Sequence, residues 1–188
     1  LKSFSVDLDV IDMEQDFTPY KLVVLPMLYM VKPGVAERLE AALDDSVAAH
    51  QVADVEVGAF LSSGVDSSYL VERACSAGSR LRTFSVGYAE GRLSELSAAQ
   101  GFARHLGVEN VACTVSAEEF FDAMPDIQYF MDEPLPNPSE NPLFLLAQNA
   151  ARSVKVVLSG EGADELFGGY PNYLQEGHAA AYERRVPR

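Results

Sequence analysis

The 188-residue sequence is poor in basic residues: 14 Lys plus Arg stand against 28 Asp plus Glu, which gives a formal charge of −14. Phosphate backbones and anionic lipid surfaces repel such a surplus of carboxylates. Nucleic-acid binding through a basic patch and electrostatic docking on a membrane are therefore poor first hypotheses. A polyphosphate bound to this chain would need positive charge from another source.

Cysteine, histidine and long apolar runs are also scarce. The two cysteines, Cys75 and Cys113, match no metal-ligand spacing and cannot form a disulfide framework, so we expect buried, reduced thiols. The longest apolar run, residues 21–31, is too short to span a bilayer, and we find no signal peptide before it. We expect a cytoplasmic protein whose three histidines lie at the surface or in helix caps rather than on a metal: His50, His105 and His178.

Apolar residues make up 48% of the chain, enough to bury a core at this length, and their spacing predicts alternating strands and helices. We expect strands at 6–11, 21–28, 55–61, 81–86, 108–115 and 154–158. We expect helices at 35–50, 67–76, 94–106 and 143–152. Another helix begins with a capping box, Ser116 and Glu119, and is divided near Pro125. Residues 134–142, which contain four prolines, are expected to form an extended loop.

This alternation, with right-handed crossovers, implies a doubly wound, mainly parallel α/β sheet in a three-layer αβα arrangement. Ligands of such sheets bind beyond the carboxyl ends of the strands. Two polar turns that contain glycine follow predicted strands, at residues 62–68 and 159–170. These two turns are the candidate functional segments.

The first turn, Ser62-Ser63-Gly64-Val65-Asp66-Ser67-Ser68, leads into the N-terminus of a helix, where unpaired N–H groups and the helix dipole favour an anion such as phosphate. Gly64 allows close approach of the backbone, and three hydroxyls could donate to phosphate oxygens: those of Ser62, Ser67 and Ser68. Asp66 would repel phosphate unless a divalent cation lies between them, which points to Mg²⁺. The alternative is a serine-rich helix cap in which Asp66 only caps the helix.

The second turn brings three carboxylates together within five residues, those of Glu161, Asp164 and Glu165. They would repel one another unless they are separated or neutralised. If the two preceding strands are neighbours, Asp164 can face Asp66 and share Mg²⁺, with Glu161 near the reacting substrate. The alternative makes Asp164 and Glu165 first-turn helix acids that the dipole favours.

Together, the two turns and residues 81–88 resemble the synthetase domain of glutamine-dependent asparagine synthetases, and Leu158–Tyr170 carries the most specific motif. Their pyrophosphate loop is usually Ser-Gly-Gly-x-Asp-Ser, so Ser63 departs from the pattern at its second position. The resemblance runs from about residue 39 to the end and implies an ATP pyrophosphatase-type fold. β-Lactam synthetases share that fold and its adenylation chemistry, which makes them the near relatives to exclude.

The resemblance implies that ATP and Mg²⁺ activate the side-chain carboxylate of aspartate as an acyl-adenylate, with release of pyrophosphate, before ammonia displaces AMP. It assigns the pyrophosphate portion to Ser62, Gly64, Asp66, Ser67 and Ser68. It assigns the nucleoside to Leu61, Val86, Ser159 and Gly160. It assigns Mg²⁺ to Asp66 and Asp164. Glu161 matches the family glutamate needed for forming or using the acyl-adenylate, where a carboxylate could accept a proton from the amine.

Two parts of the family pattern are missing. The family begins with a glutaminase domain whose N-terminal cysteine is the nucleophile, and this chain has no counterpart, so glutamine hydrolysis is not expected. The family also supplies an active-site lysine downstream of the Gly-Gly-Tyr motif, whereas the only lysines here are Lys2, Lys21, Lys32 and Lys155. We therefore expect an incomplete ligase core.

The first 35 residues resemble part of the Rossmann-like trimerisation domain of barrel-type microbial β-galactosidases. We expect residues 1–35 to be a strand-loop-strand extension of different origin, joined to the same sheet, and residues 36–188 to be the ATP-binding synthetase domain, truncated at its C-terminus. No glycosidase activity follows, because the catalytic barrel is absent. A hybrid chain and a natural linker both fit this pattern.

Two other functions remain open from sequence. One is a non-catalytic or engineered α/β scaffold that keeps the motifs only as structure. The other is a different ATP pyrophosphatase, such as an RNA-thiolating or nucleotide-amidating enzyme, although the acidic charge argues against RNA and the second turn favours the asparagine branch.

Overall fold

The computed structural model describes residues 33–89, 95–132, 139–167 and 169–170. They belong to two compact units, one formed by residues 43–160 and the other holding residues 33–42 and the described residues from 161 onward. The strands predicted at 6–11 and 21–28 lie outside the described residues.

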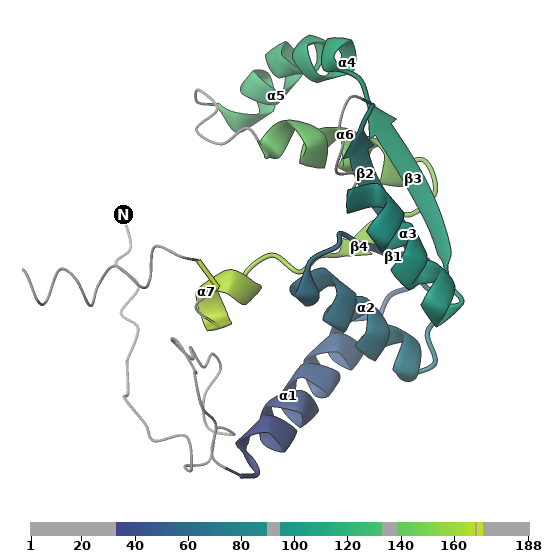
Figure 1. Cartoon of the computed structure of the whole chain (residues 1–188), viewed down its shortest axis with the longest axis vertical. Coiled ribbons are helices and arrows are strands. Elements are labelled where there is room, and N and C mark those ends of the chain that lie inside the picture. Colours follow the sequence, from purple (N-terminus) through teal and green to yellow (C-terminus); the bar gives the residue numbers. More distant parts are fainter. Residues whose placement is uncertain (1–32, 90–94, 133–138, 168, 171–188) are drawn as a thin grey trace, which may run out of the picture. The chain divides into compact units, whose positions relative to one another are not determined.

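The larger unit contains a parallel sheet of four strands in the order β3-β2-β1-β4 (Figure 1). The strands are β1 (Val57–Phe60), β2 (Arg82–Tyr88), β3 (Glu109–Val115) and β4 (Val156–Leu158). Every neighbouring pair is parallel, which confirms the predicted α/β class. β4 pairs with β1 in the register Ala59↔Leu158, so the strands that precede the two candidate turns are neighbours.

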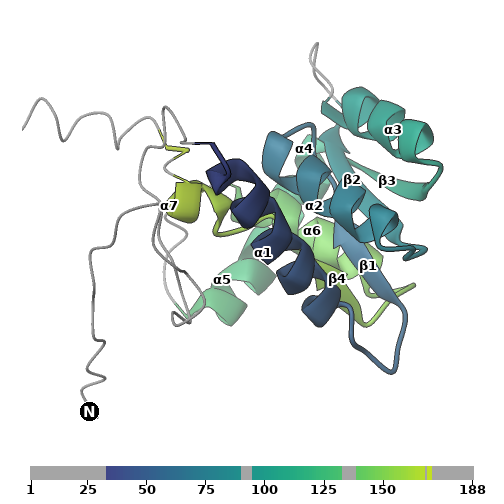
Figure 2. The ribbon, with the colours of Figure 1, turned by 90° about the horizontal axis from the view of Figure 1, so that it is seen from below.

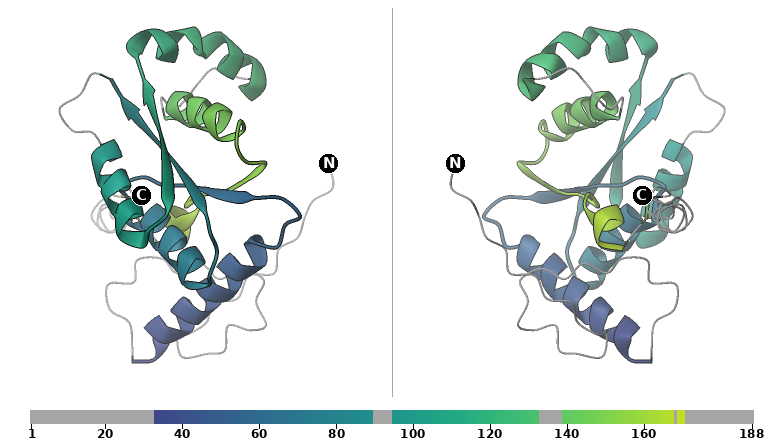
Figure 3. Two further views of the ribbon diagram at one scale, coloured as in Figure 1. Left: turned by 90° about the vertical axis from the view of Figure 1, so that its right-hand side faces the viewer. Right: turned by 90° about the vertical axis from the view of Figure 1, so that its left-hand side faces the viewer.

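Helices cover both faces of this sheet, as Figure 3 shows for α3 (Glu95–Leu106) and α6 (Glu140–Ala150). On one face, α2 (Val65–Ser76) and α3 pack against the strands in a cluster rich in alanine, which lets helix and sheet approach closely. Its buried members are Val57, Ala59, Leu61, Val71, Ala74, Leu81, Ala99, Ala103 and Leu158. On the other face, α6 packs in a cluster formed by Phe84, Leu146, Ala150 and Val154. The predicted three-layer arrangement is confirmed.

The capping box is present as predicted. The Oγ atom of Ser116 accepts a hydrogen bond from the N–H of Glu119 (3.2 Å), and the Glu119 carboxylate accepts one from the N–H of Ser116 (2.9 Å). The helix that begins there is divided, as predicted, into α4 (Ala117–Asp122) and α5 (Met124–Met131), with Pro125 at the start of α5. A proline is tolerated in the first turn because its missing N–H would have no partner there. Figure 2 shows α5 beside α6.

The remaining helices are α1 (Val35–His50) and α7 (Ala163–Phe167). The bounds of α1 agree with the predicted 35–50. The helix α7 lies within the segment predicted as a glycine-rich turn, and it carries Asp164 and Glu165 in its first turn, as the simpler alternative required.

Several predicted boundaries were wrong by two or three residues. Strand β1 begins at Val57 instead of residue 55, α2 begins at Val65 instead of residue 67, and β2 ends at Tyr88 instead of residue 86. Helix α6 begins at Glu140 instead of residue 143, so Pro142 belongs to the helix and not to the extended loop. Its position in the first turn explains why the ring does not break the helix. Strand β4 begins at Val156 instead of residue 154, because the Val154 N–H is bonded to the carbonyl of Ala150 at the end of α6 (2.9 Å). Residues 133–138 of the predicted loop lie outside the described residues.

The described cysteines and histidines, residue types that are scarce in the sequence, lie on helices and strands outside the two candidate turns. Cys75 and Cys113 are free thiols, as predicted, but both are half-buried rather than buried, and burial raises the pKa of each. His50 lies at the end of α1 with Nδ1 2.7 Å from the carbonyl oxygen of Ser46, and His105 lies exposed in the last turn of α3. His178 is outside the described residues. None of the described helices is both long and apolar enough to cross a bilayer.

Candidate functional site

The two candidate turns begin at the same edge of the sheet, because β1 and β4 are parallel neighbours. Gly160, two residues past β4, lies against the first turn of α2. A Cβ on Gly160 would stand 3.0 Å from the amide nitrogen of Ser67 and 3.3 Å from the Cβ of Asp66. The first of these atoms belongs to the backbone and the second is bonded to it, so neither can move away unless the start of α2 shifts. Glycine is therefore what lets the second turn approach the start of α2 this closely.

Within the first turn, two serines hold the loop in shape. Ser67 Oγ accepts the N–H of Ser62 (3.1 Å) and donates to the carbonyl of Gly64 (3.3 Å). The hydroxyl oxygens of Ser62 and Ser67 are 2.8 Å apart, and the N–H of Gly64 donates to Ser62 Oγ (3.0 Å). Ser67 is buried, whereas Ser62 is exposed. Ser67 thus acts inside the loop. Because its hydroxyl has a single proton, Ser62 keeps its own proton for an outside acceptor only when the Ser67 proton is directed to Ser62 Oγ instead of to the Gly64 carbonyl.

The N-terminus of α2 has no side-chain cap. Its N-cap is Gly64, in extended conformation (φ −73°, ψ 154°), and no side chain caps it by a hydrogen bond. Asp66 lies inside the first turn and is exposed, so it is not the N-cap residue that the simpler alternative required. The backbone N–H groups and the positive end of the helix dipole attract negative charge at such a position. Ser68, half-buried, follows one residue after Ser67.

The predicted nucleoside contacts lie on different faces of the sheet. The Leu61 side chain is 2% exposed and packs beneath α2 and α3, whereas Val86 packs in the cluster with α6. A nucleoside at this edge would therefore meet the backbone of Leu61 and not its side chain. Ser159 and Gly160 are half-buried and directly follow β4. Their roles in binding a nucleoside stay predictions.

The second turn continues into the other compact unit. There the carbonyl of Asp164 accepts the N–H of Gly169 (2.9 Å), and a Cβ on Gly169 would overlap the Asp164 carboxylate. Asp164 is half-buried, while Glu161 and Glu165 are exposed. The second glycine of the Gly-Gly-Tyr motif thus has a steric role that the sequence pattern did not reveal.

The pKa of Tyr170 responds to the negative charges of this turn. Its hydroxyl donates to Glu165 Oε1 (2.9 Å), and this hydrogen bond, together with the charges of Glu165, Asp164 and Glu161, raises the pKa of Tyr170 to about 12. Sequence reasoning missed the link between Tyr170 and Glu165. The three clustered carboxylates were the signal that could have suggested it.

The predicted Mg²⁺ site draws on both units. Asp66 belongs to residues 43–160 and Asp164 to the other unit, and within the described ranges no three His, Cys, Asp or Glu side chains gather as a metal site. Carboxylate oxygens are the donors that Mg²⁺ prefers, and this ion commonly uses one or two of them together with phosphate oxygens of the substrate. The donor set fits Mg²⁺, and the pairing of Asp66 with Asp164 stays a prediction.

Comparison with known proteins decides the family. Residues 38–188 match the family described as asparagine synthase. The chain belongs to the asparagine synthase family. Residues 1–47 match the β-galactosidase trimerisation domain, in line with the resemblance noted for the first 35 residues. Both matches include residues 38–47, which lie within α1.

Several relatives in this family are similar to the chain. A putative glutamine-hydrolyzing asparagine synthetase of Mycobacterium tuberculosis is 48% identical over 139 residues, covering 74% of this chain and 21% of that protein. Asparagine synthetase 1 of Bacillus subtilis is 42% identical over 150 residues, covering 80% and 24%. Asparagine synthetase B of Escherichia coli is 34% identical over 159 residues, covering 74% and 28%. This chain thus spans less than a third of the length of these relatives.

Solved structures are more distant. The NH3-dependent NAD synthetase of Campylobacter jejuni is 16% identical, covers 71% of this chain and 60% of that protein, and has a TM-score of 0.48.

Proposed function

We propose that this chain is the ATP-binding core of an amide ligase, which activates the side-chain carboxylate of aspartate as an acyl-adenylate, releases pyrophosphate and passes the acyl group to ammonia. The observation that carries this proposal is the close approach of Gly160 to the start of α2, beside an N-terminus that no side chain caps. Membership of the asparagine synthase family supports this chemistry, and the relatives described above are named asparagine synthetases.

In this proposal the first turn holds the pyrophosphate portion of ATP. The amide groups at the start of α2 and the hydroxyls of Ser62 and Ser68 would donate hydrogen bonds to the phosphate oxygens. Ser67 would act indirectly: its oxygen accepts the Ser62 N–H, and its proton, directed to Ser62 Oγ, would leave the Ser62 proton for phosphate. Gly64 and Gly160 would keep side chains away from the phosphates, while Leu61, Val86 and Ser159 lie on the route to the nucleoside.

Asp66 and Asp164 would hold Mg²⁺. The ion would supply the positive charge that this acidic chain lacks and would neutralise the phosphates of ATP. Since the net charge is −14, we expect ATP without a divalent cation to bind poorly.

Glu161 would act at the acyl-transfer step. A carboxylate beside the acyl-adenylate can orient ammonia and accept its proton as nitrogen attacks the carbonyl carbon and AMP leaves. The negative field that raises the pKa of Tyr170 would also favour a cationic group near this turn.

A pyrophosphate-release assay with ATP, Mg²⁺, aspartate and ammonia tests the proposal, together with titration calorimetry of ATP and Mg²⁺. Asp66→Ala should abolish ATP binding. Asp126→Ala is a matched control, since both residues are exposed aspartates in the first turn of a helix. Absence of ATP binding by the unaltered chain, under conditions where an intact relative binds, would refute the proposal. Binding without pyrophosphate release would identify a binding-competent fragment.

Three further points belong to the proposal. The divided origin, with residues 1–35 as an extension and 36–188 as the synthetase domain, stays a prediction, as does a hybrid origin of the chain. A cytoplasmic location is also kept as a prediction. Ammonia is the nitrogen donor we propose.

A further inference from the structure

Two buried hydroxyl groups interrupt an otherwise apolar face of the sheet. Thr83 is 0% exposed and Ser85 is 1% exposed, and both lie on β2. They occupy alternate positions with the core residue Phe84, which packs with α6, so the two hydroxyls lie on the face covered by α2 and α3. A buried hydroxyl costs free energy unless it is hydrogen-bonded, so the partners of these two groups matter.

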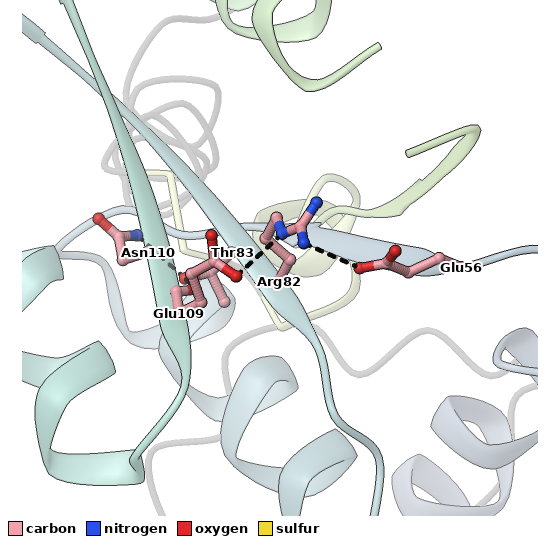
Figure 4. Close-up of polar contacts among 5 residues, drawn as sticks. All are labelled: Glu56, Arg82, Thr83, Glu109 and Asn110. Carbon is pink, nitrogen blue, oxygen red and sulfur yellow. Dashed lines mark hydrogen bonds and ion pairs between the residues drawn. The ribbon is translucent and has the colours of Figure 1, made fainter. Parts of the chain in front are cut away.

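Asn110, on β3, joins the two hydroxyls. It lies opposite Thr83 in the parallel register, and Figure 4 labels both side chains together with Glu109. Its amide nitrogen donates to Thr83 Oγ1 (3.0 Å) and to Ser85 Oγ (2.9 Å). The two N–H groups of one side-chain amide are thereby divided between two hydroxyl oxygens.

Each hydroxyl in turn donates a hydrogen bond to a backbone carbonyl. Thr83 Oγ1 donates to the carbonyl of Glu109 (2.9 Å), which is within β3. Ser85 Oγ donates to the carbonyl of Leu61 (2.6 Å), the residue immediately before the first candidate turn. Because a carbonyl oxygen can only accept, each hydroxyl uses its single proton there and can only accept from Asn110, which matches the two N–H donors that Asn110 supplies.

Both backbone polar groups of Leu61 are therefore hydrogen-bonded to β2. Its N–H donates to the carbonyl of Phe84 (2.9 Å), and its carbonyl accepts from Ser85. Strand β1 ends at Phe60, and the loop begins at Ser62. The orientation of the Leu61 carbonyl therefore sets the direction in which the chain enters the loop.

We propose that Ser85, oriented by Asn110, is a positioning residue for the loop at residues 62–68. Its hydroxyl holds the Leu61 carbonyl so that the loop leaves the sheet in the conformation that places Ser62 and Gly64 at the start of α2. The role in ATP binding rests on the proposed function, whereas the effect on the loop itself does not. Thr83 shares Asn110 and the same degree of burial, but its hydrogen bonds to Asn110 and to the Glu109 carbonyl lie away from the loop, which makes it the matched control.

Three variants of the full chain separate positioning from stability. Ser85→Ala removes the bond to Leu61. Asn110→Asp keeps the shape but replaces the amide donor by an acceptor, which draws the Ser85 proton away from Leu61. Thr83→Val removes a buried hydroxyl of the same kind and leaves the bond between Ser85 and Leu61 in place.

Hydrogen exchange of the ligand-free chain, thermal unfolding and calorimetry with ATP and Mg²⁺ give the readouts. For Ser85→Ala and Asn110→Asp we expect exchange in residues 61–68 to rise about fivefold and the Kd for ATP to rise about fivefold, the size expected for one lost hydrogen bond. For Thr83→Val we expect a similar loss of thermal stability, with loop exchange and Kd changed less than about twofold.

The outcomes distinguish the two proposals. Equal effects of all three variants on loop exchange would overturn the positioning role, because they would reduce it to general stability. Unchanged exchange in Ser85→Ala would overturn it as well. If exchange responds as expected but the unaltered chain binds no ATP, the positioning role stands and the proposed function fails.

Discussion

The backbone of Gly160 lies so close to the first turn of α2 that a Cβ at this position would stand 3.0 Å from the amide nitrogen of Ser67. The neighbours are main-chain atoms and the Cβ of Asp66, so relief would require the loop or the helix start to shift. This contact joins the two segments that the sequence analysis singled out separately. A substitution of Gly160 by alanine, which adds one methyl group, is therefore a direct test of the site.

We predict that Gly160→Ala weakens ATP binding by about tenfold or more, because the added carbon displaces the N–H groups at the start of α2, and such donors act only in a fixed geometry. Titration calorimetry with ATP and Mg²⁺ measures the effect. Gly101→Ala is the control: Gly101 lies inside α3, and a Cβ there would meet only the end of the Arg104 side chain at 3.9 Å. That change should leave Kd unaltered and stabilise the chain by about 0.5–1 kcal/mol. Equal affinity of both variants would contradict the prediction.

The capping box gives a prediction about stability and pH. The Ser116 N–H holds the pKa of Glu119 below its ordinary value of 4.5. A lowered folded-state pKa stabilises the chain above the unfolded pKa, and this contribution is lost as pH falls through the folded value. We predict that Ser116→Ala costs about 1 kcal/mol in urea unfolding at neutral pH. Alanine keeps the Ser116 N–H but removes the hydroxyl that donates to the Glu119 carboxylate (2.9 Å) and also lowers its pKa. The part of the difference that comes from this hydrogen bond should be lost below about pH 4.5. A difference that stays constant from pH 7 to pH 3 would count against this account.

Local signals predicted the parts of the fold that local chemistry controls. Helix α1 begins and ends where the apolar spacing indicated, and the helices before Gly78 and Gly107 stop at residues with φ of +88° and +71°, which glycine adopts easily. The sequence leaves open whether the two motif-bearing strands are neighbours, which is a condition of the shared Mg²⁺ site, and the register shows that they are.

What the sequence did not predict depends on contacts between distant segments. The bond from Ser85 to Leu61 and its control by Asn110 require the register of three strands, which no local pattern contains. Pro142 was placed in a loop because proline usually ends a helix, although its position in a first turn removes that penalty. The overlap that Gly169 avoids with Asp164 likewise appears only in three dimensions.

The thiols provide a prediction about reactivity. Burial, and next the nearby charge of Glu72, raise the pKa of Cys75; burial, and next Glu119, raise that of Cys113. Because the thiolate is the reactive form, both cysteines should react with a disulfide reagent such as DTNB more slowly than a free thiol at pH 7.5. In urea that unfolds the chain, the rates should approach that of a free thiol. Rapid reaction of either cysteine in the native chain at pH 7.5 would refute this.

The field of the second turn can be measured directly at Tyr170. We predict that its phenol titrates with a pKa of about 12, because ionisation would lose the hydrogen bond to Glu165 and add charge beside Glu165, Asp164 and Glu161. Glu165→Gln should lower this pKa substantially toward 10, whereas Glu161→Gln, which removes the weakest of these influences, should lower it only slightly.

Carbon-13 NMR of labelled tyrosine from pH 8 to pH 13, with Tyr170→Phe to assign the resonance, gives both values. Since the folded-state pKa is raised, the contribution of the bond between Tyr170 and Glu165 is fully present below about pH 10 and is lost as pH rises through about 12. If Tyr170 titrates near 10, or if the two glutamine variants shift it equally, the carboxylates of this turn do not act on it as the geometry requires. The case for a cation-attracting field beside Glu161 would then lose its support.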